Sequence, residues 1–215
     1  TGSTNITING GDMSSAEIIG GSLTDYAYLG QGADRKAIVY GDTNININGG
    51  NLGLVVGGGQ AIFSYYAGSR TDTAPESDVE GTTNINITGG SLSGNIIGGG
   101  HAYSSAEGKS ITPLASIANV KGTTNINISG GTIEKNIYGG GFADGKSAAA
   151  NVEGDTNITI SGGDIGGNIY AGGLAENGGT ANVTGNSTVT FLNGSTFAKD
   201  VYGTSKVNSV LANND

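Results

Sequence analysis

Residues 124–141 read TNINISGGTIEKNIYGGG, and this stretch decides the fold. Its first five residues alternate polar and apolar side chains, which is the period of a half-buried strand. A glycine pair follows, and paired glycines permit a positive φ and a tight corner. A second short apolar segment at 136–138 ends in a glycine cluster. The stretch therefore predicts two short strands joined by glycine corners.

The first strand of this unit recurs along the whole chain. Five copies follow the pattern Thr-Asn-Ile-x-Ile, and a degenerate sixth copy occupies 187–191. The copies begin at residues 4, 43, 83, 124, 156 and 187, so they start 39, 40, 41, 32 and 31 residues apart. Such periods are typical of solenoids, in which each unit covers only its neighbours. We predict an all-β, single-stranded parallel β-helix (β-solenoid) of about six rungs of 31–41 residues, right-handed as parallel crossovers overwhelmingly are.

Parity along each strand separates inward from outward side chains. A Val four residues ahead of the strand, the Thr and both Ile share one parity and should point inward, whereas the Asn should form a ladder facing solvent. The predicted core ladder contains Ile6, Ile45, Ile85, Ile126, Ile158 and Val189. By the same rule the second strand directs an apolar ladder outward, which the following loop or another surface must cover. Its members are Val56, Ile97, Tyr138, Tyr170 and Tyr202.

The composition fits such a fold and excludes other classes. The 42 glycines are too many for helices, since an interior glycine costs about 0.5–1 kcal/mol relative to alanine. A net charge of −9 without a basic run makes nucleic acid and anionic membrane poor partners. The absence of cysteine excludes disulfides and thiolate metal sites. No apolar run is long enough for a spanning helix.

Variation between the repeats concentrates after the second glycine cluster. The segments 22–37, 60–77 and 101–118 are long, whereas their equivalents at 142–150 and 174–181 are short. Insertions in a solenoid map to one corner, which is often the binding face. We expect residues 1–215 to form one solenoid domain, or a fragment of a longer one, with three long corner loops.

These loops supply a candidate binding surface. Aromatic and charged loop side chains could contact a sugar or a protein, or they could pack over the outward apolar ladder. The candidates are Tyr26, Tyr28, Phe63, Tyr65, Tyr66, Arg70, His101 and Tyr103.

We predict no catalytic, cofactor-binding or metal site. His101 is the single histidine and follows a glycine cluster, so we interpret it as a surface loop residue. Asp42 and Asp155 lie at equivalent corners several rungs apart, which suits neither an acid/base pair nor a calcium site. The glycine clusters are not expected to be phosphate-binding loops, because no helical pattern follows them. The chain is therefore expected not to be an enzyme.

The recurring T-N-I-x-I-x-G-G, followed by N-I-Y-G-G-G, resembles the Gly/Asn-rich repeats of bacterial autotransporter and adhesin passenger domains. The resemblance covers almost the whole chain and rests on the style of the repeat. It implies a β-helical passenger on the surface of a diderm bacterium or outside it, used for adhesion or as a spacer. The implied partner is a host or microbial surface glycan or protein.

Three classes of function stay open from the sequence. The first is a non-enzymatic extracellular surface or adhesin scaffold. The second is a polysaccharide-processing or phage-spike-like β-helix, which would need an acidic cluster on one face. The third is a self-associating fibre, joined through the solenoid ends or the Tyr138/Tyr170/Tyr202 face, or an ice-binding surface. Ice binding would need an outward Thr array where this repeat directs Asn.

Overall fold

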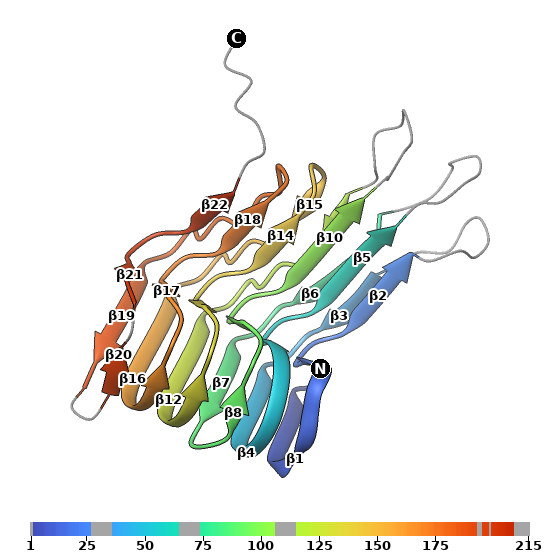
Figure 1. The fold of residues 1–215 in the computed structure, drawn as a ribbon. Coiled ribbons are helices and arrows are strands. Elements are labelled where there is room, and N and C mark those ends of the chain that lie inside the picture. Colours follow the sequence, from blue (N-terminus) through green and yellow to red (C-terminus); the bar gives the residue numbers. More distant parts are fainter. Residues whose placement is uncertain are drawn as a thin grey trace.

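The structure is a computed structural model and describes residues 2–26, 36–64, 74–105, 115–192, 195–197 and 199–208. These residues contain strands and turns but no helix, and every named strand pairing is parallel. Successive repeats lie side by side from the N-terminal to the C-terminal end of the molecule (Figure 1). The predicted all-β, parallel, β-helix-like architecture is confirmed.

The largest sheet has 12 strands and contains both strand segments predicted for each repeat. The first segments are β1 (Thr4–Ile19), β4 (Thr43–Val56), β7 (Thr83–Ile87), β12 (Thr124–Ile133), β16 (Thr156–Ile165) and β19 (Ser187–Phe191). In β1, β4, β12 and β16 the strand continues around the glycine corner. In the other coils β8 (Ser91–Leu92) and β20 (Ser195–Phe197) take the place of this continuation. The separate second segments are β9 (Ile96–Ile97), β13 (Ile137–Tyr138), β17 (Ile169–Tyr170) and β21 (Val201–Tyr202).

Two smaller sheets complete the coils. The six-stranded sheet contains β2 (Leu23–Tyr26), β5 (Gln60–Ser64), β10 (His101–Ser105), β14 (Phe142–Asp144), β18 (Leu174–Glu176) and β22 (Lys206–Asn208). The four-stranded sheet contains β3 (Lys36–Val39), β6 (Glu76–Val79), β11 (Ser116–Ile117) and β15 (Ala148–Ala149).

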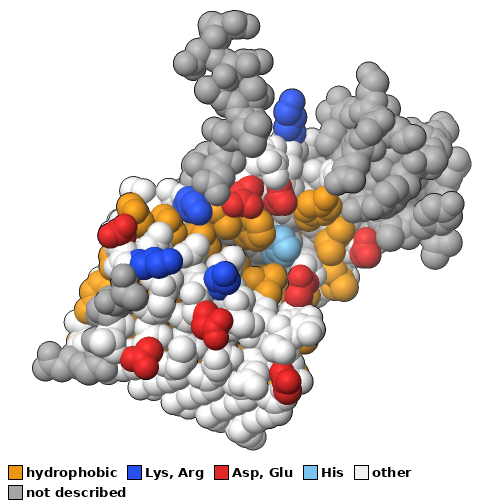
Figure 2. Space-filling view, in the orientation of Figure 1, with side chains coloured by type: hydrophobic (Ala, Val, Ile, Leu, Met, Phe, Trp, Pro, Cys, Tyr) orange, Lys and Arg blue, Asp and Glu red, His pale blue; other side chains and the backbone are white. Residues whose placement is uncertain are grey.

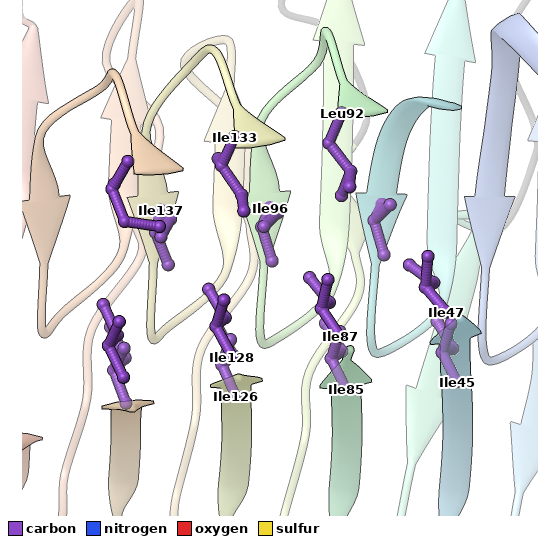
Figure 3. Packing of buried hydrophobic residues seen from close by; sticks show 14 of the residues in the cluster. Ile45, Ile47, Ile85, Ile87, Leu92, Ile96, Ile126, Ile128, Ile133 and Ile137 are labelled. Carbon is purple, nitrogen blue, oxygen red and sulfur yellow. The ribbon is translucent and has the colours of Figure 1, made fainter. Parts of the chain in front are cut away.

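The predicted isoleucine ladder forms the centre of the main core. Ile45, Ile85, Ile126 and Ile158 pair in register from strand to strand and are at most 1% exposed. Ile6 and Val189 continue the ladder at its two ends, where they are partly buried. Figure 3 shows side chains of the first segments pointing toward those of the second segments, so each coil closes its own slice of core.

The predicted directions of Thr and Asn are also confirmed. The buried Thr hydroxyls donate to a carbonyl of the second glycine corner at 2.5–2.6 Å, which ties the start of the first strand to that corner; the residues are Thr43, Thr83, Thr124 and Thr156. On the outside, Asn84 Nδ2 donates to Asn44 Oδ1 at 3.0 Å and Asn125 Nδ2 to Asn84 Oδ1 at 2.9 Å. The side-chain amides thus form a hydrogen-bonded ladder along the coil axis.

Glycine is favoured at the corners for two different reasons. The second residue of the first pair has a positive φ, for example 101° at Gly50 and 90° at Gly131, a conformation that L side chains rarely adopt. At the second corner the chain touches the next coil instead. A Cβ added to Gly98 would lie 2.3 Å from the carbonyl oxygen of Gly139.

The segments 22–37, 60–77 and 101–118 are not corner loops throughout, which corrects one expectation. Their ends are the strands of the two smaller sheets, from β2 to β3, β5 to β6 and β10 to β11. These strands enclose a second, thin core of alanines: Ala61, Ala102, Ala118, Ala143, Ala148, Ala150, Ala175 and Ala181. Small side chains give a weak alternation signal in the sequence, although they allow the two sheets to pack closely.

The outward apolar ladder is covered by the six-stranded sheet. Val56, Ile97, Tyr138 and Tyr170 are at most 6% exposed, and they form a cluster separate from the main core. Leu174 belongs to this cluster, and Phe142 packs against it. The ladder therefore has the predicted parity but is no free face, and only Tyr202, in the last coil, is exposed.

Candidate functional site

Three neighbouring coils carry an insertion at the same boundary between the two smaller sheets. The connections span residues 27–35, 65–75 and 106–115, and they follow β2, β5 and β10, which are consecutive strands of one sheet. They lead into β3, β6 and β11, which are likewise consecutive. In the fourth coil the same connection, between β14 and β15, takes only residues 145–147. Three insertions consequently leave the ladder at adjacent points, and we call this the insertion edge.

Most of the predicted binding residues cannot be placed at this edge. Tyr28, Tyr65, Tyr66 and Arg70 lie outside the described residues, as does the side chain of Tyr26. Phe63 lies in β5 and is fully buried, so it packs in the interior and is no binding residue. This corrects the prediction for Phe63, whose inward parity matches that of Ala61 in the same strand.

His101 and Tyr103 both lie on the outward face of β10 and are partly exposed. The His101 ring stacks on Phe142 with ring centroids 4.6 Å apart, and its Nδ1 lies 3.0 Å from Gln60 Nε2. Gln60 Nε2 also donates to Glu17 Oε2 at 2.8 Å. Burial lowers the pKa of His101, although the charges of Glu17 and Asp144 oppose the shift. His101 is thus a packed strand residue, not the loop residue that we expected.

Around it, Figure 2 shows the histidine side chain among hydrophobic side chains, with acidic groups at the border. The stacked tyrosines belong to this region: Tyr138 and Tyr170 have ring centroids 5.0 Å apart, and Tyr170 and Tyr202 4.8 Å. Asn136 and Asn168 each donate to the hydroxyl of the tyrosine two residues later. Because the rings of these three tyrosines cover each other's faces, the stack leaves the outer face of Tyr202 open to a sugar ring.

A carboxyl pair that sequence reasoning missed lies on β6. Burial and a hydrogen bond with Glu76 raise the pKa of Asp78 to about 6, and Asp78 is only 4% exposed. Burial also pushes the pKa of Glu76 upward, but hydrogen bonds with Lys36 and Asp78 lower it on balance. The pKa values of the two carboxyl groups thus move apart, and Asp78 is the one that keeps its proton to higher pH.

The position of Asp78 in the repeat explains its main contact. Asp78 Oδ1 accepts from the backbone N–H of Asn119, Asn119 Oδ1 accepts from Asn151, and Asn151 Oδ1 accepts from Asn182. Each of these residues directly precedes a Val of the repeat, and this shared position could have indicated from the sequence that they form one column. Asp78 is therefore the acidic member of an asparagine ladder.

The other acidic candidates behave as corner residues. Asp42 Oδ1 accepts from the backbone N–H of Thr82, and Asp155 Oδ1 accepts from that of Asn186. In the part of the chain that the structure describes, no group of three His, Cys, Asp or Glu side chains could hold a metal ion. Over the same residues no helix is long and apolar enough to cross a membrane.

Comparisons with protein-family models, with curated proteins and with solved structures found no match.

Proposed function

We propose that this chain is a non-enzymatic extracellular scaffold of the adhesin type, which presents its three insertions as one binding surface. The observation that carries the proposal is the insertion edge, where three consecutive strands of a sheet each lead into a long connection. Binding residues are commonly found on loops that a rigid scaffold positions.

The ladder beneath the edge has the properties of such a scaffold. Its core side chains are fully buried in the middle coils, and side-chain amides bond from coil to coil on the outside. This regularity fixes the spacing of the insertions along the axis. The proposed ligand is a surface glycan or protein, and the proposed location is the outside of a bacterial cell. For the coil we propose a right-handed path, as parallel crossovers favour.

The carboxyl pair gives little support to a polysaccharide-processing enzyme. Glycosidase carboxyl groups stand about 5 Å or more apart, so that substrate or water fits between them. Asp78 and Glu76 instead hydrogen-bond each other, and Asp78 is buried. Their arrangement fits a structural ladder better than an acid/base pair.

The proposal can be tested by replacing the insertions. In one variant the connections 27–35, 65–75 and 106–115 are each exchanged for the short turn Gly145-Lys146-Ser147 of the fourth coil. We expect circular dichroism and the melting temperature to change little, because β14 and β15 already use this turn. Binding to an array of immobilised glycans and extracellular-matrix proteins should fall by more than about tenfold.

A matched control changes the outer asparagine face instead. Asn46, Asn86 and Asn127 form one outward column, and their joint replacement by Ser should leave binding unchanged. Binding that survives in the triple-exchange variant, or a parent chain that binds nothing on the array, would contradict the proposed function.

A further inference from the structure

Exposed large hydrophobic side chains occur only in the first and last coils of the described chain. Leu23 and Tyr40 belong to the first coil, and the others to the last. The last-coil residues, between 41% and 55% exposed, are Phe191, Leu192, Val201 and Tyr202. Among the described residues, these two coils also carry the sheet edges that pair with no further strand, with β1 and β2 at one end and β19, β21 and β22 at the other.

At the last coil the core columns are open. Phe191 is 41% exposed and pairs with Ile160, which is fully buried; Val201 is 43% exposed and pairs with Ile169, which is 1% exposed. Tyr202 likewise ends the tyrosine stack. Natural sheets protect such edges with charges or proline. The strands β19 and β21 contain neither.

The first coil offers the matching surface. Following the pairing from strand to strand, Ile8 heads the column that Phe191 ends, and Ile18 heads the column that Val201 ends. Ile19 in turn heads the column of Tyr202. Each of these three columns therefore begins with an apolar residue in the first coil and ends with an exposed one in the last coil.

We infer that the last coil of one molecule docks on the first coil of a second copy, so that all columns continue across the junction. The partner is another copy of this chain, because its first coil has the strand order, the register and the inward apolar positions that a coil placed after the last one would need. The contact joins two different surfaces, so it does not close on itself and generates filaments. This inference does not depend on the proposed function of the insertion edge.

Charge modulates the junction at one column. Asp200 ends the column that begins at Glu17 and passes through Asn136 and Asn168, so docking brings two carboxylates together. In the six-stranded sheet, Lys206 ends the column that begins at Leu23, so docking would bring its charge within two residues of Asp25 along β2. The junction should therefore strengthen when salt screens the two carboxylates or when Asp200 becomes neutral.

Sedimentation velocity and negative-stain microscopy of the 215-residue chain test the inference. We expect rods that lengthen with protein concentration. Val201→Lys should weaken association by more than about tenfold, because it places a charge in an open core column. Leu192→Lys is the matched control: Leu192 is 55% exposed in the last coil, against 43% for Val201, but its parity is opposite to that of Phe191, and rods should persist.

Mixing two blocked variants tests the polarity of the contact. Val201→Lys blocks the last coil, and Ile18→Lys, or Ile6→Lys if the first does not fold, blocks the first coil. Each variant alone should be monomeric. Together they should form a one-to-one dimer through the two ends that remain free. A Val201→Lys variant that still dimerises alone would show contact between like ends and would overturn the inference.

Asp200→Asn provides a gain of function. Asparagine is the residue of this column in three earlier coils, so the variant should fold, and association should strengthen about two- to fivefold, the range of a surface charge pair. A parent chain that stays monomeric at all concentrations would overturn the inference. So would a variant ending at Asn208 that associates while the full chain does not, since residues 209–215 would then be the occupant.

Discussion

The middle coils and the last coil use the same columns but bury them to very different extents. Along one column Ile87, Ile128 and Ile160 are at most 1% exposed, whereas Phe191 in the last coil is 41% exposed. Phe191 is the larger and no less apolar side chain. Residue type alone therefore does not decide burial: among the described residues no coil follows Phe191, whereas Ile8, at the other end of the column, is still only 7% exposed.

The largest expected effect comes from deleting core volume in the two regions. Ile128→Ala should lower the free energy of unfolding by about 3 kcal/mol, because it opens a cavity between two packed coils. Phe191→Ala removes more atoms but should cost about 1 kcal/mol or less, since its site is already open on one side. Urea unfolding at low protein concentration measures both. Equal losses would contradict the comparison.

The second glycine corner sharpens the comparison at the level of the backbone. Gly98→Ala should cost about 2–3 kcal/mol, because its new Cβ would meet the carbonyl oxygen of Gly139. Gly203 is the equivalent residue of the last coil, and a Cβ added there would meet no atom within 4 Å, so Gly203→Ala should stay within about 0.5 kcal/mol. Thermal melting compares the pair, and a loss at Gly203 as large as that at Gly98 would show that contact with the next coil is not the cause.

The smallest expected effect on stability comes from two aspartates that each accept a backbone hydrogen bond from the next coil: Asp78, which is buried, and Asp155, which is partly exposed. The folded pKa of Asp78, about 6, lies above the ordinary value of 3.8, so the native state holds more protons between these pH values. This contribution to stability is complete below about pH 4 and is lost as the pH rises through about 6. Asp78→Asn should therefore raise the free energy of unfolding at pH 7 by about 1–2 kcal/mol.

The same substitution should flatten the decline of stability between about pH 4 and 6. Asp155→Asn is the matched control: Asp155 accepts a backbone hydrogen bond like that of Asp78 but in a partly exposed corner. Its replacement should change the free energy of unfolding at pH 7 by less than about 0.5 kcal/mol. If Asp78→Asn destabilises the protein at pH 7, burial of a charge at this position is not the dominant cost.

Sequence reasoning succeeded where side chains repeat with large apolar contrast. The isoleucine ladder, the buried Thr and the outward Asn followed from parity, since the side chains of a strand alternate between its faces. It failed for the two smaller sheets, because their inward residues are small, such as Ala61 and Ala102, and alternate with larger side chains that are only partly buried. It also failed for Phe63, which was assigned to a loop although it continues the inward parity of β5.

The candidate site was predicted less completely than the fold. The position of the insertions could be recognised from differences in repeat length, whereas the pairing of Glu76 with Asp78 and the stacking of His101 on Phe142 could not. Phe142 lies 41 residues after His101 in the sequence, and their contact depends on the register of β10 against β14.

The sequence by itself determined which residues share a column, because a two-residue period and glycine corners at constant places leave one register that aligns the isoleucines of successive first strands. Only the tertiary structure decided which outward side chains stay exposed. The six-stranded sheet packs against the outer side of the tyrosine ladder and buries Tyr138, while nothing among the described residues follows Tyr202. Whether the six-stranded sheet covers the tyrosines depends on the angle at which the chain leaves the second glycine corner. The pattern of polar and apolar residues carries no information about this angle.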